Sequence, residues 1–269
     1  MQEKSALGRA MAMVRDLRER CPWDREQTRE TLRPYLVEEA HELDQAIASG
    51  DPAAIRDEVA DLLLHLAWQL VLAEELGEFT SSAAADDLEA KMKRRHPHLF
   101  DLGPKREWEA LKVREPLVGA RESGVLAGLP ASLPELLMAL RLQERAAAVG
   151  FDWPDAAGPA AKVREELAEV EAELLGPGTP PTTRLDHEIG DLLFSVVNLA
   201  RKAGVNPGPA LERANTRFKE RFGAVERLAG ERGVDVHTAG LEALDRLWGE
   251  AKLREQSTVN GQRELPREQ

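Results

Sequence analysis

The sequence predicts an all-α protein. Alanine, leucine, glutamate and arginine dominate the composition, whereas isoleucine occurs three times and tyrosine once. Unbranched side chains lose little rotamer freedom in a helix, so this balance favours helices over strands. Apolar residues also recur at helical spacing in residues 31–48 and 162–175, and the second stripe consists of Val163, Leu167, Val170 and Leu174. Glycine and proline separate the periodic runs, which predicts helices joined by short connections.

Size and charge exclude several classes of protein. A chain of 269 residues has room for two ordinary domains. Its net charge of −12 argues against binding to duplex nucleic acid, which requires a basic surface. No uncharged apolar run of about 18 residues is present, so we expect no membrane span. The single cysteine, Cys21, fits a reducing compartment, and the first residues lack the apolar core of a signal peptide; both favour the cytoplasm.

An internal repeat is the most informative feature of the sequence. Two acidic motifs, a pair of basic residues and a tryptophan motif occur in the same order in each half of the chain. The matching segments are 38–42 and 165–169, 58–63 and 188–193, Lys91/Arg95 and Arg217/Arg221, and 108–115 and 248–255. The repeat predicts two tandem modules, at 1–118 and 135–256, with a Gly- and Pro-rich linker at 119–134 and a flexible tail at 257–269.

The acidic motifs place carboxylates in pairs on helices. Glu166 and Glu169 are neighbours on one flank of a helix, as are Glu188 and Asp191 on the next. The second helix is apolar nearly all round, so we expect it to be buried, where ionised carboxylates are costly unless they are neutralised. A short connection favours an antiparallel pair that brings the four carboxylates together. An all-oxygen ligand set selects Mg²⁺ or Mn²⁺.

A solvated helix face is the competing interpretation of any one acidic pair, because the chain has 48 acidic residues. Two pairs at helical spacing, one of them in an apolar helix, favour a metal site, and their repetition favours it further. Two other interpretations remain open. One is a non-enzymatic acidic scaffold or regulatory partner-binding protein; the other is a ferritin-like redox bundle, which requires Glu-x-x-His pairs that the motifs lack.

Three segments make the chain resemble the MazG family of all-α nucleoside triphosphate pyrophosphohydrolases: Cys21–Asp24, Arg94–Phe100 and Val149–Trp153. The similarity runs from about residue 7 to residue 255. The resemblance implies Mg²⁺-dependent hydrolysis of NTPs and dNTPs between the α- and β-phosphates, giving NMP and pyrophosphate, and a role in clearing the nucleotide pool. It also implies a homodimer, in which the carboxylate-bearing helix pairs are completed into four-helix bundles.

The resemblance also assigns residues to roles. The metal ligands would be Glu166, Glu169, Glu188 and Asp191. Glu165 would be a general base, a residue that supports the ligands without touching the metal, or a surface group. The nucleotide would contact Lys162, Arg217, Arg221, Trp248 and Lys252, with Trp248 available to stack on the base. For the basic residues the competing interpretation is an ordinary ion-paired surface, and for Trp248 it is core packing.

The first module repeats the carboxylates as Glu39, Glu42, Glu58 and Asp61, but its surroundings differ. Tyr35 stands in place of Lys162, and His65 and Trp68 stand in place of Ser195 and Asn198. With fewer cations and a bulkier wall, it should hold a triphosphate less well. We therefore expect catalysis in the second module. The first would serve folding and dimerisation, or keep its own substrate preference.

Overall fold

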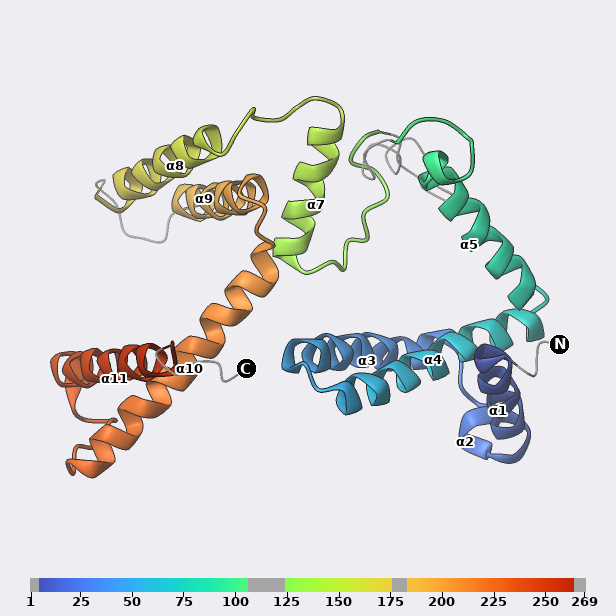
Figure 1. Ribbon diagram of the computed structural model, residues 1–269, viewed down its shortest axis with the longest axis horizontal. Coiled ribbons are helices and arrows are strands. Elements are labelled where there is room, and N and C mark those ends of the chain that lie inside the picture. The colour runs from blue at the N-terminus through green and yellow to red at the C-terminus, as the bar shows by residue number, and fades with distance from the viewer. Residues whose placement is uncertain (1–4, 106–123, 176–182, 264–269) are drawn as a thin grey trace. The chain divides into compact units, whose positions relative to one another are not determined.

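The computed structural model describes residues 5–105, 124–175 and 183–263, and these residues form helices and turns without any strand. The all-α prediction is confirmed. The chain divides into two compact units, residues 1–106 and 107–269 (Figure 1). Among the described residues, no helix combines the length and the apolar composition that crossing a bilayer requires.

Unit 1 is built around a helical hairpin. Helix α3 (Arg29–Ser49) ends at Gly50, whose φ of 71° lies in the left-handed region that glycine adopts without strain. Asp51 then accepts a hydrogen bond from the backbone N–H of Ala53 and starts helix α4 (Pro52–Glu75). This tight connection makes α3 and α4 an antiparallel pair. The remaining elements are α1 (Ala6–Arg20), α2 (Pro22–Arg25), α5 (Ser81–Arg95) and the 3₁₀ helix η2 (Pro97–Leu99).

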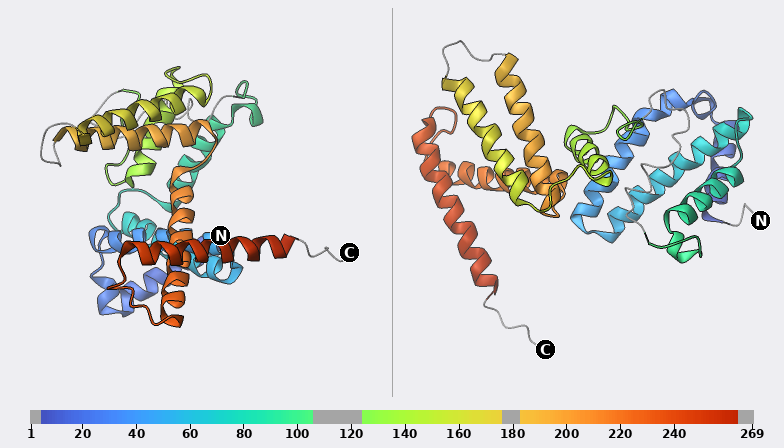
Figure 2. Two further views of the ribbon diagram at one scale, coloured as in Figure 1. Left: turned by 90° about the vertical axis from the view of Figure 1, so that its left-hand side faces the viewer. Right: turned by 90° about the horizontal axis from the view of Figure 1, so that it is seen from above.

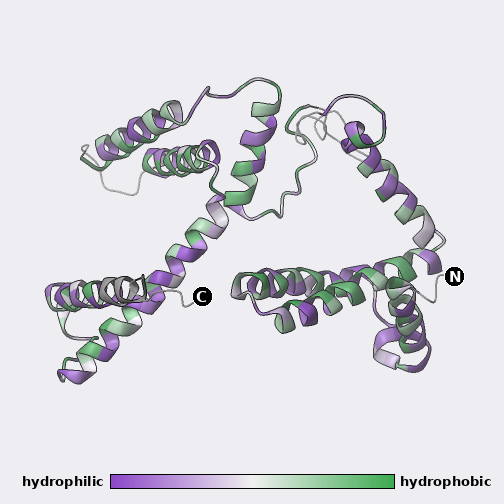
Figure 3. Ribbon diagram, in the orientation of Figure 1, coloured by the Kyte–Doolittle hydropathy of each residue, from purple (hydrophilic) through white to green (hydrophobic). Residues whose placement is uncertain are grey.

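The core of unit 1 lies where α1 crosses the second half of α4. In Figure 3 the ribbon of α4 is coloured mostly as hydrophobic. Trp68 is 3% exposed there, and the guanidinium of Arg18 lies 5.3 Å from the centre of its indole ring. Arg18 also forms an ion pair of 2.7 Å with Glu75. The buried residues are Met11, Val14, Leu32, Ala67, Trp68, Val71 and Leu72.

Unit 2 contains a second carboxylate-bearing hairpin. Helices α8 (Ala157–Leu175) and α9 (Thr183–Lys202) lie side by side and run in opposite directions (Figure 2). An ion pair of 3.2 Å between Arg184 and Glu173 joins the start of α9 to the end of α8. Helix α7 (Glu135–Ala148) packs against α9, where the Gln143 side chain donates a hydrogen bond of 2.9 Å to the Phe194 carbonyl.

Helices α10 (Pro207–Glu231) and α11 (Gly240–Arg263) form a second pair in unit 2, with a small core of their own. Among the described helices, α11 packs against α10 and against no other helix. Helix α11 extends through Arg263 and so includes part of the segment predicted as a tail. Residues 264–269 lie outside the described residues, as do 119–123 of the linker and the tryptophan motif at 108–115.

Burial of α9 differs from the sequence-based expectation. Its apolar residues Leu193, Phe194 and Val196 are 56%, 44% and 45% exposed in the single chain. Helix α4 also leaves Val59 and Leu66 about half exposed. The two helices are apolar nearly all round, but one hairpin partner covers only part of that circumference. An apolar face therefore remains uncovered on each.

Candidate metal and nucleotide site

Three of the predicted metal ligands meet between α8 and α9. One carboxylate oxygen from each of Glu166, Glu169 and Glu188 lies within 4.8 Å of the others. The spacing of three along α8 puts two of them on one flank, and the antiparallel packing brings Glu188 opposite. Glu166 is buried at 4% exposed, whereas Glu169 is exposed. Asp191 lies outside this group of atoms, one turn further along α9, and is exposed.

Lys162 is the cation of this cluster. Its ammonium lies 2.6 Å from Glu166 and 2.8 Å from Glu165, because the three residues share one flank of α8 at spacings of four and three. These hydrogen bonds raise the pKa of Lys162 above its ordinary value, so the ammonium keeps its charge. Glu165 is exposed and contacts the cluster only through Lys162, whereas Glu166 faces the other carboxylates directly.

The carboxylates repel one another. Burial, together with the neighbouring charges of Glu166 and Glu188, raises the pKa of Glu169 above its ordinary value. One lysine cannot neutralise three clustered carboxylates. The donor set is all oxygen, and the arrangement suits one or more hard divalent cations such as Mg²⁺ or Mn²⁺.

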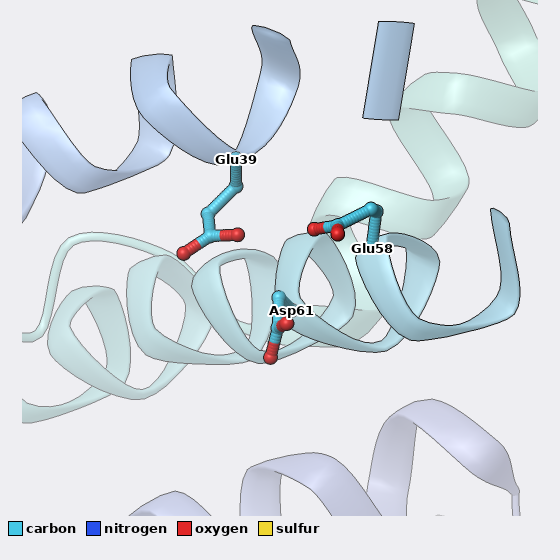
Figure 4. Close-up of side chains that lie close together, drawn as sticks. All are labelled: Glu39, Glu58 and Asp61. Atoms are coloured by element: carbon cyan, nitrogen blue, oxygen red, sulfur yellow. The ribbon is translucent and has the colours of Figure 1, made fainter. Parts of the chain in front are cut away.

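The first module holds a matching cluster. Figure 4 shows Glu39 reaching from α3 toward Glu58 and Asp61 on α4, with one oxygen of each within 4.8 Å of the others. Burial raises the pKa of Glu39 and of Glu58, and the charges of Asp61 and Glu42 raise both further. Glu42 therefore belongs to the same electrostatic cluster, although it lies outside the closest group of atoms and is exposed.

The surroundings of the first cluster differ as the sequence predicts. His65 is buried at 6% exposed, and its Nε2 atom lies 4.0 Å from Glu39. Burial lowers the pKa of His65, so the imidazole is not a substitute for the ammonium of Lys162. Its Nδ1 atom is buried without a hydrogen-bond partner. Trp68, about one turn beyond His65 on α4, is part of the core.

The residues predicted to hold the nucleotide on α10 and α11 form a separate group. Arg221 is ion-paired with Glu255 at 2.8 Å, and its guanidinium lies 5.0 Å from the ring centre of Trp248. Trp248 also packs against Phe218, with 5.3 Å between ring centres. Arg217 and Lys252 are exposed. Among the described helices, α10 contacts α7 and α9, whereas α11 contacts neither α8 nor α9, the two helices that carry the carboxylates.

Reasoning from sequence missed a set of residues beside α9. Gln143 is buried at 6% exposed, and Asp152 forms an ion pair of 2.5 Å with Arg201. In the sequence, Gln143 stands out only as the single amide residue among the apolar and charged residues of 135–148. Asp152 stood in a segment noted only for the family resemblance. Its partner Arg201 lies 49 residues away and could not be identified by spacing.

Comparison with known proteins identifies the relatives of the chain. The family model of the MazG nucleotide pyrophosphohydrolase domain matches residues 27–100. A Thermotoga maritima protein named nucleoside triphosphate pyrophosphohydrolase/pyrophosphatase MazG is 40% identical over 87% of this chain and 90% of its own length. An Escherichia coli K12 nucleoside triphosphate pyrophosphohydrolase is 38% identical over 91% of this chain and 95% of its own.

Proposed function

Because the chain belongs to the MazG family of nucleoside triphosphate pyrophosphohydrolases, we propose that it hydrolyses NTPs and dNTPs at the α–β phosphoanhydride. The products are NMP and pyrophosphate. One observation assigns the proposed activity to named residues: the carboxylates of Glu166, Glu169 and Glu188 lie close together between two antiparallel helices. We place this activity in the cytoplasm, where it removes surplus or damaged nucleotides.

The second module holds the proposed catalytic residues. Glu166, Glu169, Glu188 and Asp191 would hold Mg²⁺, and Mn²⁺ can substitute because it accepts the same oxygen ligands. When bound, the metal polarises the phosphates and lowers the pKa of the attacking water. Lys162 fixes the carboxylate of Glu166 and offers positive charge to a phosphate. Glu165, which accepts a hydrogen bond from Lys162, is placed to act as base or to orient that lysine.

A homodimer would complete the site. Ile189, Leu193 and Val196 share one side of α9 at spacings of four and three, and they leave an apolar face uncovered; a second helix pair packed on it makes a four-helix bundle. Arg217 and Arg221 lie on α10, and Trp248 and Lys252 lie on α11, which contacts neither α8 nor α9 in the described chain. In the dimer they would contact the nucleotide held by the partner's carboxylates.

The first module is proposed as the folding and dimerisation partner. It keeps the carboxylates Glu39, Glu42, Glu58 and Asp61, yet Tyr35 replaces the lysine, and His65 and Trp68 are buried beside them. The family model matches this module, which supports the alternative that it retains an activity of its own. The proposed modules span 1–118 and 135–256, joined by a linker at 119–134.

The direct test is product analysis with purified full-length protein. Incubation with Mg²⁺ and a panel of NTPs and dNTPs should release NMP and pyrophosphate, and Glu166→Gln should abolish this release. Glu89→Gln, at an exposed ion pair on α5, is the matched control and should leave the rate unchanged. NDP and phosphate as the sole products would contradict the proposal. A chain that stays monomeric by light scattering would contradict the dimer.

A further inference from the structure

His65 brings a nitrogen atom to the edge of the first carboxylate cluster. It follows Asp61 by four residues on α4, so the two side chains leave the same side of the helix one turn apart. The Nε2 atom of His65 lies 4.0 Å from a carboxylate oxygen of Glu39 on the facing helix α3. The imidazole therefore faces the cluster with Nε2, whereas its Nδ1 atom is buried.

The imidazole of His65 is buried without a polar partner. The residue is 6% exposed, which makes it more than nine-tenths buried. Its Nδ1 atom has no hydrogen bond in the described chain, and the distance from Nε2 to Glu39 is too long for one. Burial lowers the pKa of His65, so the ring is neutral and its contact with Glu39 is not an ion pair. Burial of an unpaired polar group costs free energy, and a ligand bound at Nε2 would recover part of that cost.

Three carboxylates and this imidazole make a set of four ligand groups. One oxygen from each of Glu39, Glu58 and Asp61 lies within 4.8 Å of the others, and Figure 4 shows their side chains converging from α3 and α4. Four protein ligands around one ion are the arrangement of a structural Zn²⁺ site. Ligand atoms on a tetrahedral Zn²⁺ lie about 3.5 Å apart, and a rotation of the Glu39 side chain covers the difference.

The nitrogen ligand changes which ion the cluster should prefer. Ligand sets made of oxygen alone suit Mg²⁺ and Mn²⁺. An imidazole instead suits Zn²⁺ and neighbouring transition-metal ions, and it binds them in its neutral form. A cluster of carboxylates with one neutral imidazole is therefore better matched to Zn²⁺ than to Mg²⁺.

The second module differs at both positions that decide this preference. Ser195, at 7% exposed, stands in place of His65, so the matching position offers no imidazole. Lys162 supplies positive charge to Glu166 there, whereas the first module has Tyr35 in place of the lysine. The two clusters are alike in their carboxylates but differ in the group that selects the ion.

We propose that the first module binds Zn²⁺ through Glu39, Glu58, Asp61 and His65, and that the ion joins α3 to α4 as a structural centre. The proposal goes beyond the proposed hydrolysis, which takes place with Mg²⁺ in the second module. A metal ion that binds the folded hairpin more tightly than the unfolded chain adds to its stability. The carboxylates of the first module then have a role that requires no nucleotide.

Calorimetric titration of the metal-free, full-length protein with Zn²⁺ and with Mg²⁺ tests the proposal. The tightest Zn²⁺ site of the wild type should bind Zn²⁺ more strongly than Mg²⁺. His65→Ser, which introduces the residue of the second module, should raise the Kd for this Zn²⁺ by at least about tenfold, because even residues behind metal ligands change affinity by about 10- to 100-fold. The Kd for Mg²⁺ should change little. His65→Gln, which keeps most of the side-chain volume, should behave in the same way. His237→Ser removes an exposed histidine of unit 2 and should bind Zn²⁺ as the wild type does.

X-ray absorption of protein loaded with one equivalent of Zn²⁺ shows whether an imidazole binds the ion. The wild type and His237→Ser should give the imidazole signal, and His65→Gln should lose it. Asp61→Asn should lose it as well, because the ion needs both groups. Asp61 is exposed, so this variant keeps the test decisive if replacement of the buried histidine prevents folding.

Unchanged Zn²⁺ affinity in a folded His65 variant, or an imidazole signal that persists in Asp61→Asn, would overturn the zinc site. A wild-type protein that binds Zn²⁺ no more tightly than Mg²⁺ would overturn it too. None of these measurements contains a nucleotide. A failure to release pyrophosphate would therefore contradict the proposed function alone, and normal hydrolysis would not rescue the zinc site.

Discussion

The ammonium of Lys162 lies 2.6 Å from the carboxylate of Glu166, which is almost completely buried. The second module thus carries its own counter-ion where the first module has Tyr35. The Lys162–Glu166 ion pair therefore makes the two clusters differ in their internal repulsion when no metal is bound. The lysine offsets part of the repulsion among the second set of carboxylates, and within residues 5–105 no ammonium takes this place in the first set.

Lys162→Met should destabilise the metal-free protein by about 1–2 kcal/mol, because a buried carboxylate loses its charged partner. Thermal unfolding with EDTA and with Mg²⁺ measures the effect. Added Mg²⁺ should restore most of the lost stability but not the activity. Lys93→Met removes an exposed pair with Glu89 and is the matched control, with little change expected. Equal effects of the two substitutions would contradict the role given to Lys162.

Asp191→Asn should abolish hydrolysis, because it removes a metal-binding charge while keeping the shape of the side chain. Asp61→Asn should leave most of the activity. Each variant relieves repulsion and so should be as stable as wild type, or more stable, in EDTA. Mg²⁺ should then stabilise wild type more than Asp191→Asn. Steady-state rates and unfolding curves measure both effects, and equal inactivity of two folded, dimeric variants would contradict the division between modules.

Gly158→Ala should displace Trp153, since the new methyl group would lie 2.3 Å from its indole. The expected result is altered tryptophan fluorescence, with little loss of helix by circular dichroism. Alanine favours a helix over glycine, so the local backbone should not suffer. Gly190→Ala, whose methyl group would meet nothing within 4 Å, tests whether a glycine substitution alone has this effect.

Asp152 predicts a resistance to acid where the loop between α7 and α8 meets the end of α9. Hydrogen bonds from Arg201 hold the pKa of Asp152 at about 2, below its ordinary value of 3.8. Because the folded-state pKa is lowered, its contribution to stability is complete above pH 4 and is lost as the pH falls through 2. Asp152→Asn should therefore cost about 1–2 kcal/mol at pH 7 and progressively less below pH 4, as urea unfolding at each pH would show.

The fold was more predictable than the site. Val170 is buried as the stripe in 162–175 predicts, whereas Leu167 and Leu174 of the same stripe are exposed in the single chain. The spacing of Glu166 and Glu169 puts both in one cluster of carboxylates. The predicted burial of Leu193 is wrong for the single chain. The apolar pattern of a helix does not say whether the same chain or another molecule covers the apolar face. Asp191 lies outside the closest group, since a shared flank fixes direction but not distance.

The sequence pattern could not predict contacts between residues that lie far apart in the chain. The side chain of Trp248 is equally suited to a ligand or a core, and only the structure shows it packed against Phe218 and Arg221. The contact between Gln143 and Phe194 joins residues 51 positions apart. No helical period relates such residues, so the contact was not anticipated.

Trp68 has a consequence for how the two halves of the chain can change over generations. In the first half, a smaller residue at this position would open a void in a packed core, so the tryptophan is hard to lose once gained. In the second half, a larger residue at Asn198 would displace the Arg201 side chain, which donates hydrogen bonds to the Asn198 amide oxygen. Each copy is thus constrained in the opposite direction at the same position, and a duplicated unit cannot easily exchange its role with its twin.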